Sequence, residues 1–143
     1  MRRMIEIDGK PCEFKSSAAI PRMYRMKFGR DIFVDMNQLR KQIEMQKRLA
    51  EAEKKKAEEE GKTFDEEEFK SDLPISSLEM FENIAYLMHK HGDPEQPKDI
   101  DEWLEQFEIF DIYQIFPQML EMWNLENQRN SVPKKKNGTS TGK

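Results

Sequence analysis

The chain has 143 residues and a mass of 17.1 kDa, the size of one ordinary domain. Its 28 acidic and 24 basic residues give a net charge of −4, so it lacks the positive field that attracts nucleic acid. No apolar run reaches the roughly 20 residues of a membrane span or follows the N-terminus as in a signal peptide. Because its only cysteine, Cys12, cannot form an internal disulfide, we expect a soluble protein of a reducing compartment.

Residues 4–15 form two short alternating segments on either side of Asp8-Gly9. This dipeptide tolerates the positive φ angles of a tight hairpin turn. The sequence therefore predicts a small N-terminal β-hairpin, with Cys12 as a buried or partly exposed strand residue.

Two helices are predicted next, joined by a short connection. Either Ser16 or Ser17 can cap the first helix, over residues 18–28, and Gly29 can end it in the left-handed conformation. Asp31 is placed to cap the second helix. The apolar positions of that helix recur every three or four residues, which indicates one buried stripe: Ile32, Phe33, Met36, Leu39 and Ile43.

Residues 46–74 are highly charged. Residues 46–60 consist almost entirely of Lys, Arg, Glu, Ala and Gln, which predicts a solvated extension of the second helix that ends before Gly61. Residues 61–74 are expected to be a mobile acidic linker rather than a docking motif, although Phe64 and Phe69 leave the second reading open.

The C-terminal half contains further helical segments. Ser76 or Ser77 is expected to cap a third helix over residues 78–90, and Asp99 or Asp101 a fourth beginning near Trp103. Pro117 is expected to start a new turn or to kink the last helix. We expect residues 1–130 to form a single, mainly α domain, in which the hairpin precedes a bundle of about four to six helices. Residues 131–143 are expected to form a disordered tail, because they have almost nothing to bury.

No constellation of residues predicts catalysis or a cofactor. His89, His91 and Asp93 have the composition of a metal site, but a surface pair at a helix end fits two histidines better than a site that needs three or four ligands. There is no plausible Ser–His–Asp triad, Walker loop or dinucleotide fingerprint. We therefore expect a protein that is not an enzyme and holds no metal.

Residues 103–123 carry apolar or aromatic side chains at most positions. A helix that is apolar on several sides must be buried on several sides, and a domain this small covers only part of such a surface. The surplus predicts self-association or partner binding. The expected interaction anchors, chosen because aromatic residues dominate binding hot spots, are Phe107, Phe110, Tyr113, Phe116, Met119 and Trp123.

Several stretches, taken in order, resemble one known family. They are Phe14-Lys15-Ser16-Ser17, then residues 21–25 and 28–32, then residues 78–86, and finally residues 100–113 with Trp123. The chain resembles the tail assembly chaperones of long-tailed phages and prophages of Gram-positive bacteria. The resemblance covers residues 4–125 except the charged stretch 46–74.

The resemblance implies a mainly helical protein of the host cytoplasm that coats the tape measure protein, leaves as tail tube subunits replace it and is absent from the virion. The implied partners are the tape measure protein, the tail tube protein, further copies of the chain and a longer form made by ribosomal frameshifting. A slippery adenine run could encode Lys134-Lys135-Lys136, which otherwise read as a solubilising tail. The alternative is a small phage regulator that binds nucleic acid through a basic face: Arg22, Arg25, Lys27 and Arg30.

Overall fold

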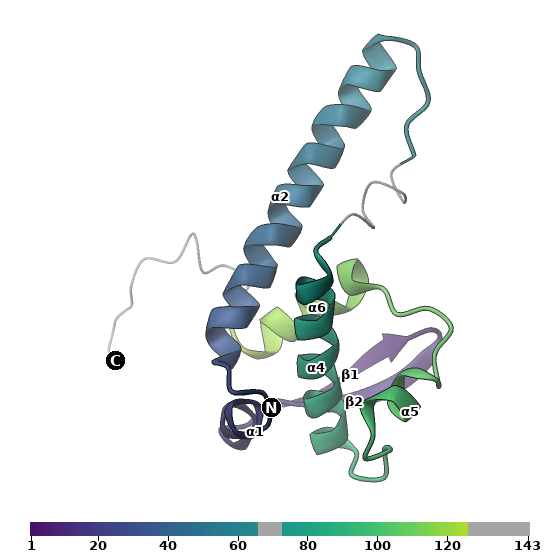
Figure 1. Cartoon of the computed structure of the whole chain (residues 1–143). Coiled ribbons are helices and arrows are strands. Elements are labelled where there is room, and N and C mark those ends of the chain that lie inside the picture. Colours follow the sequence, from purple (N-terminus) through teal and green to yellow (C-terminus); the bar gives the residue numbers. More distant parts are fainter. Residues whose placement is uncertain (66–72, 126–143) are drawn as a thin grey trace.

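The computed structural model describes residues 1–65 and 73–125, and Figure 1 shows the arrangement of the chain. The chain is mainly helical with an N-terminal hairpin, which confirms the expected fold class. The expected tail 131–143, with its three lysines, and Phe69 of the linker lie outside the described residues. The described elements are β1 (Arg2–Ile7), β2 (Lys10–Lys15), α1 (Ala19–Phe28), α2 (Ile32–Glu59), α4 (Ile75–Gly92), α5 (Ile100–Leu104) and α6 (Ile112–Met122).

Strands β1 and β2 form the antiparallel hairpin. Asp8 and Gly9 both have positive φ, at 53° and 76°, which is the turn that the sequence predicts. The hairpin begins at Arg2, two residues earlier than expected, because Arg2 pairs with Lys15 across the sheet. Every second side chain is buried, so one face of the hairpin packs on the helices: Ile5, Ile7, Cys12 and Phe14.

The caps around the α1–α2 connection follow local backbone demands. Gly29 ends α1 with φ 67°, and its N–H donates to the carbonyl oxygen of Arg25. The carboxylate of Asp31 accepts from the backbone N–H groups of Phe33 and Val34 at the start of α2. Neither Ser16 nor Ser17 caps α1, whose N-cap is Ala18 without a side-chain bond. Ser16 instead donates through Oγ to the carbonyl oxygen of Met122, 3.4 Å away. Its hydroxyl therefore bonds across the fold and does not cap the helix.

Helix α2 has 28 residues and extends well beyond the rest of the domain (Figure 1). One side of its first half is buried in the core, as the sequence predicts: Ile32, Met36, Leu39 and Ile43. In its outer part every residue from position 51 to the end of the helix is exposed except Ala57, which is half-buried. This segment is the solvated extension expected from its charge.

Helix α4 lies at the centre of the domain and contacts β2, α1, α2, α5 and α6. It begins at Ile75 with Pro74 as N-cap, so the cap expected from Ser76 or Ser77 is wrong. Ser77 is fully buried inside the first turn, where its hydroxyl contacts the side chain of Gln42. At the other end, a Cβ atom on Gly92 would lie 2.4 Å from the carbonyl oxygen of Glu13, so only glycine lets α4 approach β2 this closely.

Residues 103–123 do not form one helix. Helix α5 ends at Leu104, and Asp111 caps α6 by accepting from the N–H of Tyr113 at 3.0 Å. Asp99 caps α5, and Pro117 lies inside α6. Because the segment is two short helices with a turn between them, its apolar side chains face the core from several directions. In the described part of the chain no helix combines the length and apolar character needed to cross a bilayer.

Candidate partner-binding surface

The six residues expected to bind a partner lie on α6 or beside it, and their side chains face inward to different degrees. Phe116 and Met119 are core residues, with 1% and 0% of their surface exposed. These two are therefore not available to a partner in this structure, and the expectation for them is corrected. The other four are partly buried and pack against the core: Phe107, Phe110, Tyr113 and Trp123. A role for those four in partner binding stays a prediction.

Trp103 is the centre of an aromatic cluster that covers much of the apolar surface of residues 103–123. It is fully buried, and its ring lies 5.5 Å from the ring of Phe107 and 5.4 Å from that of Phe110, both edge to face. The ring of Phe110 also stacks on Phe81 of α4 at 4.8 Å. The domain thus covers most of the apolar surface of residues 103–123 with an aromatic cluster of its own.

His89 is part of the same interior, so its expected place in a surface pair with His91 is wrong. Only 3% of His89 is exposed, and its ring stacks on Phe14 at 5.5 Å. The indole N–H of Trp103 donates to Nδ1 of His89 at 2.8 Å, which requires that nitrogen to be unprotonated. Burial lowers the pKa of His89, with a smaller opposing effect from Asp93. No group of three possible ligands for a metal is found in the described ranges.

A buried polar network fixes α1 against α2. Asp35 is 1% exposed and accepts from the hydroxyl of Tyr24 at 2.6 Å. Arg30 donates to the same carboxylate from Nε at 2.7 Å and from Nη2 at 2.8 Å. Burial raises the pKa of Tyr24 and the bond to Asp35 raises it further, so the hydroxyl remains a donor. These contacts assign Asp35 and Arg30 a structural role.

Helix α2 carries four of the nine large apolar residues that are exposed in the described part of the chain. Val34, Met45 and Leu49 are 53%, 59% and 48% exposed. At 3.6 residues per turn they fall within about 60° of one another around the helix, opposite the side that carries Ile43. We call these three residues the outer stripe. Sequence reasoning missed it because the buried stripe thins after Ile43, although Met45 and Leu49 already stand four residues apart among charges.

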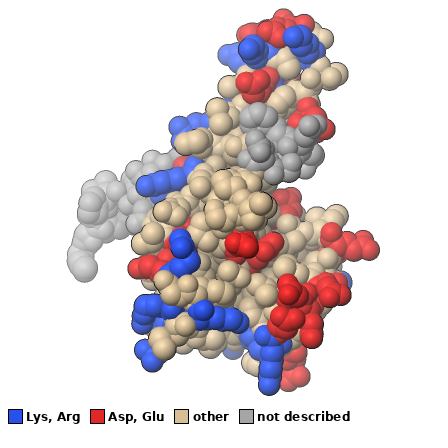
Figure 2. Space-filling model, in the orientation of Figure 1, with Lys and Arg blue, Asp and Glu red and all other residues tan. Residues whose placement is uncertain are grey.

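On the face drawn in Figure 2, acidic and basic side chains are mixed at the tip of α2, while basic side chains gather low on the left of the body and acidic ones low on the right. Of the four basic residues proposed to bind nucleic acid, Arg30 is paired with Asp35. Lys27 lies over the ring of Tyr86, with its amine 5.3 Å from the ring centre. Arg22 and Arg25 are exposed.

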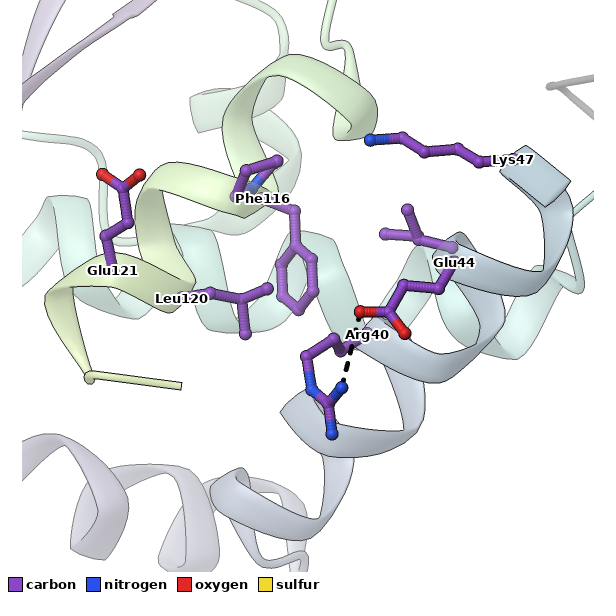
Figure 3. A pocket seen from close by; sticks show the side chains of 8 residues that line it. Arg40, Glu44, Lys47, Phe116, Leu120 and Glu121 are labelled. Carbon is purple, nitrogen blue, oxygen red and sulfur yellow. Dashed lines mark hydrogen bonds and ion pairs between the residues drawn. The ribbon is translucent and has the colours of Figure 1, made fainter. Parts of the chain in front are cut away.

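A recess lies between α2 and α6, on the side of α2 that carries Ile43 and therefore away from the outer stripe. Its volume is about 180 Å³, and its apolar lining is formed by Ile43, Phe116, Pro117 and Leu120. Figure 3 shows Phe116 and Leu120 of α6 facing α2, where Arg40 and Glu44 are joined by a dashed line. Arg40, Glu44, Lys47 and Glu121 complete the lining.

Comparison of the chain with models of protein families, with curated proteins and with solved structures finds no match. The resemblance to tail assembly chaperones therefore stays an expectation from the sequence. The described residues offer two candidate binding surfaces: the outer stripe of α2 and the recess between α2 and α6.

Proposed function

We propose that this protein is a tail assembly chaperone of a long-tailed phage or prophage, and that it binds the tape measure protein before the tail tube forms. The ordered stretches of sequence support the proposal. They fall on the end of β2, on α1, on the start of α2, on α4 and on α5 with α6. The structural observation that carries it is the outer stripe, an apolar surface on a helix that projects from the domain.

The mechanism is reversible burial of apolar helical surface. The outer stripe spans positions 34 to 49 of α2, which is about 22 Å at 1.5 Å per residue, so it can contact about four turns of a partner helix. Met45 contributes an unbranched thioether that repacks against different neighbours at low cost, which suits a partner whose sequence varies along its length. Because only three apolar residues are exposed on this side, each copy binds weakly and can be replaced by tube subunits.

The experiment is co-expression of this chain with the long helical tape measure protein from the same gene cluster. The soluble fraction of the tape measure protein should rise several-fold. The double variant M45S/L49S should lose most of this effect: each truncated side chain removes about 1 kcal/mol of apolar burial, which together weakens binding roughly 30-fold. The matched control is I109S, because Ile109 is 63% exposed in the connection between α5 and α6, outside α2.

Two results would count against the proposal. The first is an unchanged solubility of the tape measure protein in the presence of the wild-type chain. The second is tight, salt-sensitive binding of nucleic acid in a gel-shift assay, which would favour the regulator instead. Gene order offers a further check, since a chaperone gene of this family is expected between a tail tube gene and a very long tape measure gene.

A further inference from the structure

Arg40 is the most unusual polar residue of the domain. It lies on the core side of α2 with 6% of its surface exposed, yet its hydrogen bonds are few and long. Nη1 donates to Glu44 at 3.5 Å and Nη2 to Asn37 at 3.3 Å, while Nε is buried and has no acceptor among the described residues. Leaving a buried donor unpaired is costly, and more so for a charged group. The fold alone gives no reason to keep this charge inside.

The charges around the recess leave this cation incompletely neutralised. Glu121 forms its ion pair with Arg3 of β1 and not with Arg40. The ion pair between Glu44 and Arg40 spans 3.5 Å, which is long compared with a strong charge-assisted hydrogen bond. Lys47 is exposed on the opposite rim and has no ion pair within the described ranges. The recess therefore places the weakly bonded guanidinium of Arg40 beside an apolar floor, in a lining that holds two cations and two carboxylates.

We propose that this recess binds one glutamate side chain presented by a helix of the partner protein. The methylene groups of a glutamate fit against Pro117 and Leu120, and its carboxylate accepts from Arg40. A charge-assisted bond to a guanidinium is about twice as strong as a neutral one, so it supplies what the weakly bonded Nη1 and Nη2 of Arg40 lack. An inorganic anion fits less well, because it leaves the apolar floor uncovered. That the partner is the tape measure protein rests on the proposed function.

The first test uses butyrate, which has the carboxylate and apolar stem of a truncated glutamate side chain. Butyrate is titrated into the full chain, and the Nε–H resonance of Arg40 and the methyl resonances of Ile43 and Leu120 are followed by NMR. All three should shift and saturate. The uncharged isostere butyramide should shift them several-fold less, and the variant R40M should abolish the response. Equal shifts with butyramide, or no saturable shift with butyrate, would overturn the assignment.

The second test measures binding of the tape measure protein to the wild type, to R40M and to R48M. Replacing a poorly paired buried charge by an apolar residue leaves stability unchanged or raises it, so R40M should unfold at the same or a higher urea concentration. Its affinity should nevertheless fall 10-fold or more. The control R48M removes an exposed charge of the same helix and should bind as the wild type does.

The two tests separate failure of the site from failure of the function. If the wild type and R40M bind the tape measure protein equally well, the glutamate site is wrong and the chaperone proposal stands. If the wild type does not bind that protein at all, the chaperone proposal fails, and the butyrate titration alone decides whether the recess takes a carboxylate. A loss of binding in R40M together with a large loss of stability would also refute the site, because it would show Arg40 to be structural.

Discussion

Replacing Asp35 by alanine should lower the free energy of unfolding by about 3 kcal/mol. The carboxylate is buried, and the fully buried Tyr24 donates to it at 2.6 Å. Without Asp35 that hydroxyl is left in the core without an acceptor, which costs about 1–3 kcal/mol. A carboxylate in the first turn of α2 also stabilises the helix dipole by about 0.5 kcal/mol. Arg30 is half exposed and regains water, so its loss adds little.

The variant Y24F tests this explanation, because its effect on the free energy of unfolding should have opposite signs with and without Asp35. In the wild type, Y24F removes a bond to a charged acceptor and should destabilise by about 1.5 kcal/mol. In the D35A background the same change removes an unpaired hydroxyl, so it should stabilise by about 1 kcal/mol. Urea unfolding followed by far-UV circular dichroism measures all four proteins.

The control is D31A, which removes the N-cap of the same helix and should cost about 1 kcal/mol. Y24F should destabilise the D31A protein as it destabilises the wild type, because no buried group is orphaned there. The reasoning is refuted if D35A lies within about 1 kcal/mol of the wild type, or if Y24F has the same sign in both backgrounds.

Two further predictions concern α4. The variant G92A should destabilise by about 2–3 kcal/mol in urea unfolding, because the new Cβ would meet the backbone of Glu13 at 2.4 Å; an unchanged midpoint would contradict this contact. Stability should also fall as the pH drops from about 6.5 towards 5, because burial lowers the pKa of His89 and the unfolded chain then binds the extra proton. Burial lowers the pKa of His91 in the same direction, so H89Q should reduce the pH dependence of the urea midpoint without abolishing it.

The sequence by itself determined the features that depend on neighbouring backbone groups. A tight hairpin turn needs positive φ at two positions, and Asp8-Gly9 supplies both. Gly29 likewise donates to a carbonyl oxygen at the end of α1, and Asp31 accepts from N–H groups at the start of α2. Both positions could be predicted because helix ends leave these backbone groups unpaired. The buried stripe of α2 could also be predicted, because apolar residues that recur every three or four positions lie on one face of a helix.

Only the tertiary structure decided which apolar side chains are core and which are surface. A hydrophobic pattern shows that a side chain avoids water, but it does not name the surface that covers it. Phe116 and Met119 are therefore covered by the domain itself, while Met45 and Leu49, at the start of the charged part of α2, remain outside. Arg40 is buried and lines a recess together with residues of α6, about 80 positions further along the chain, a placement that no local pattern encodes.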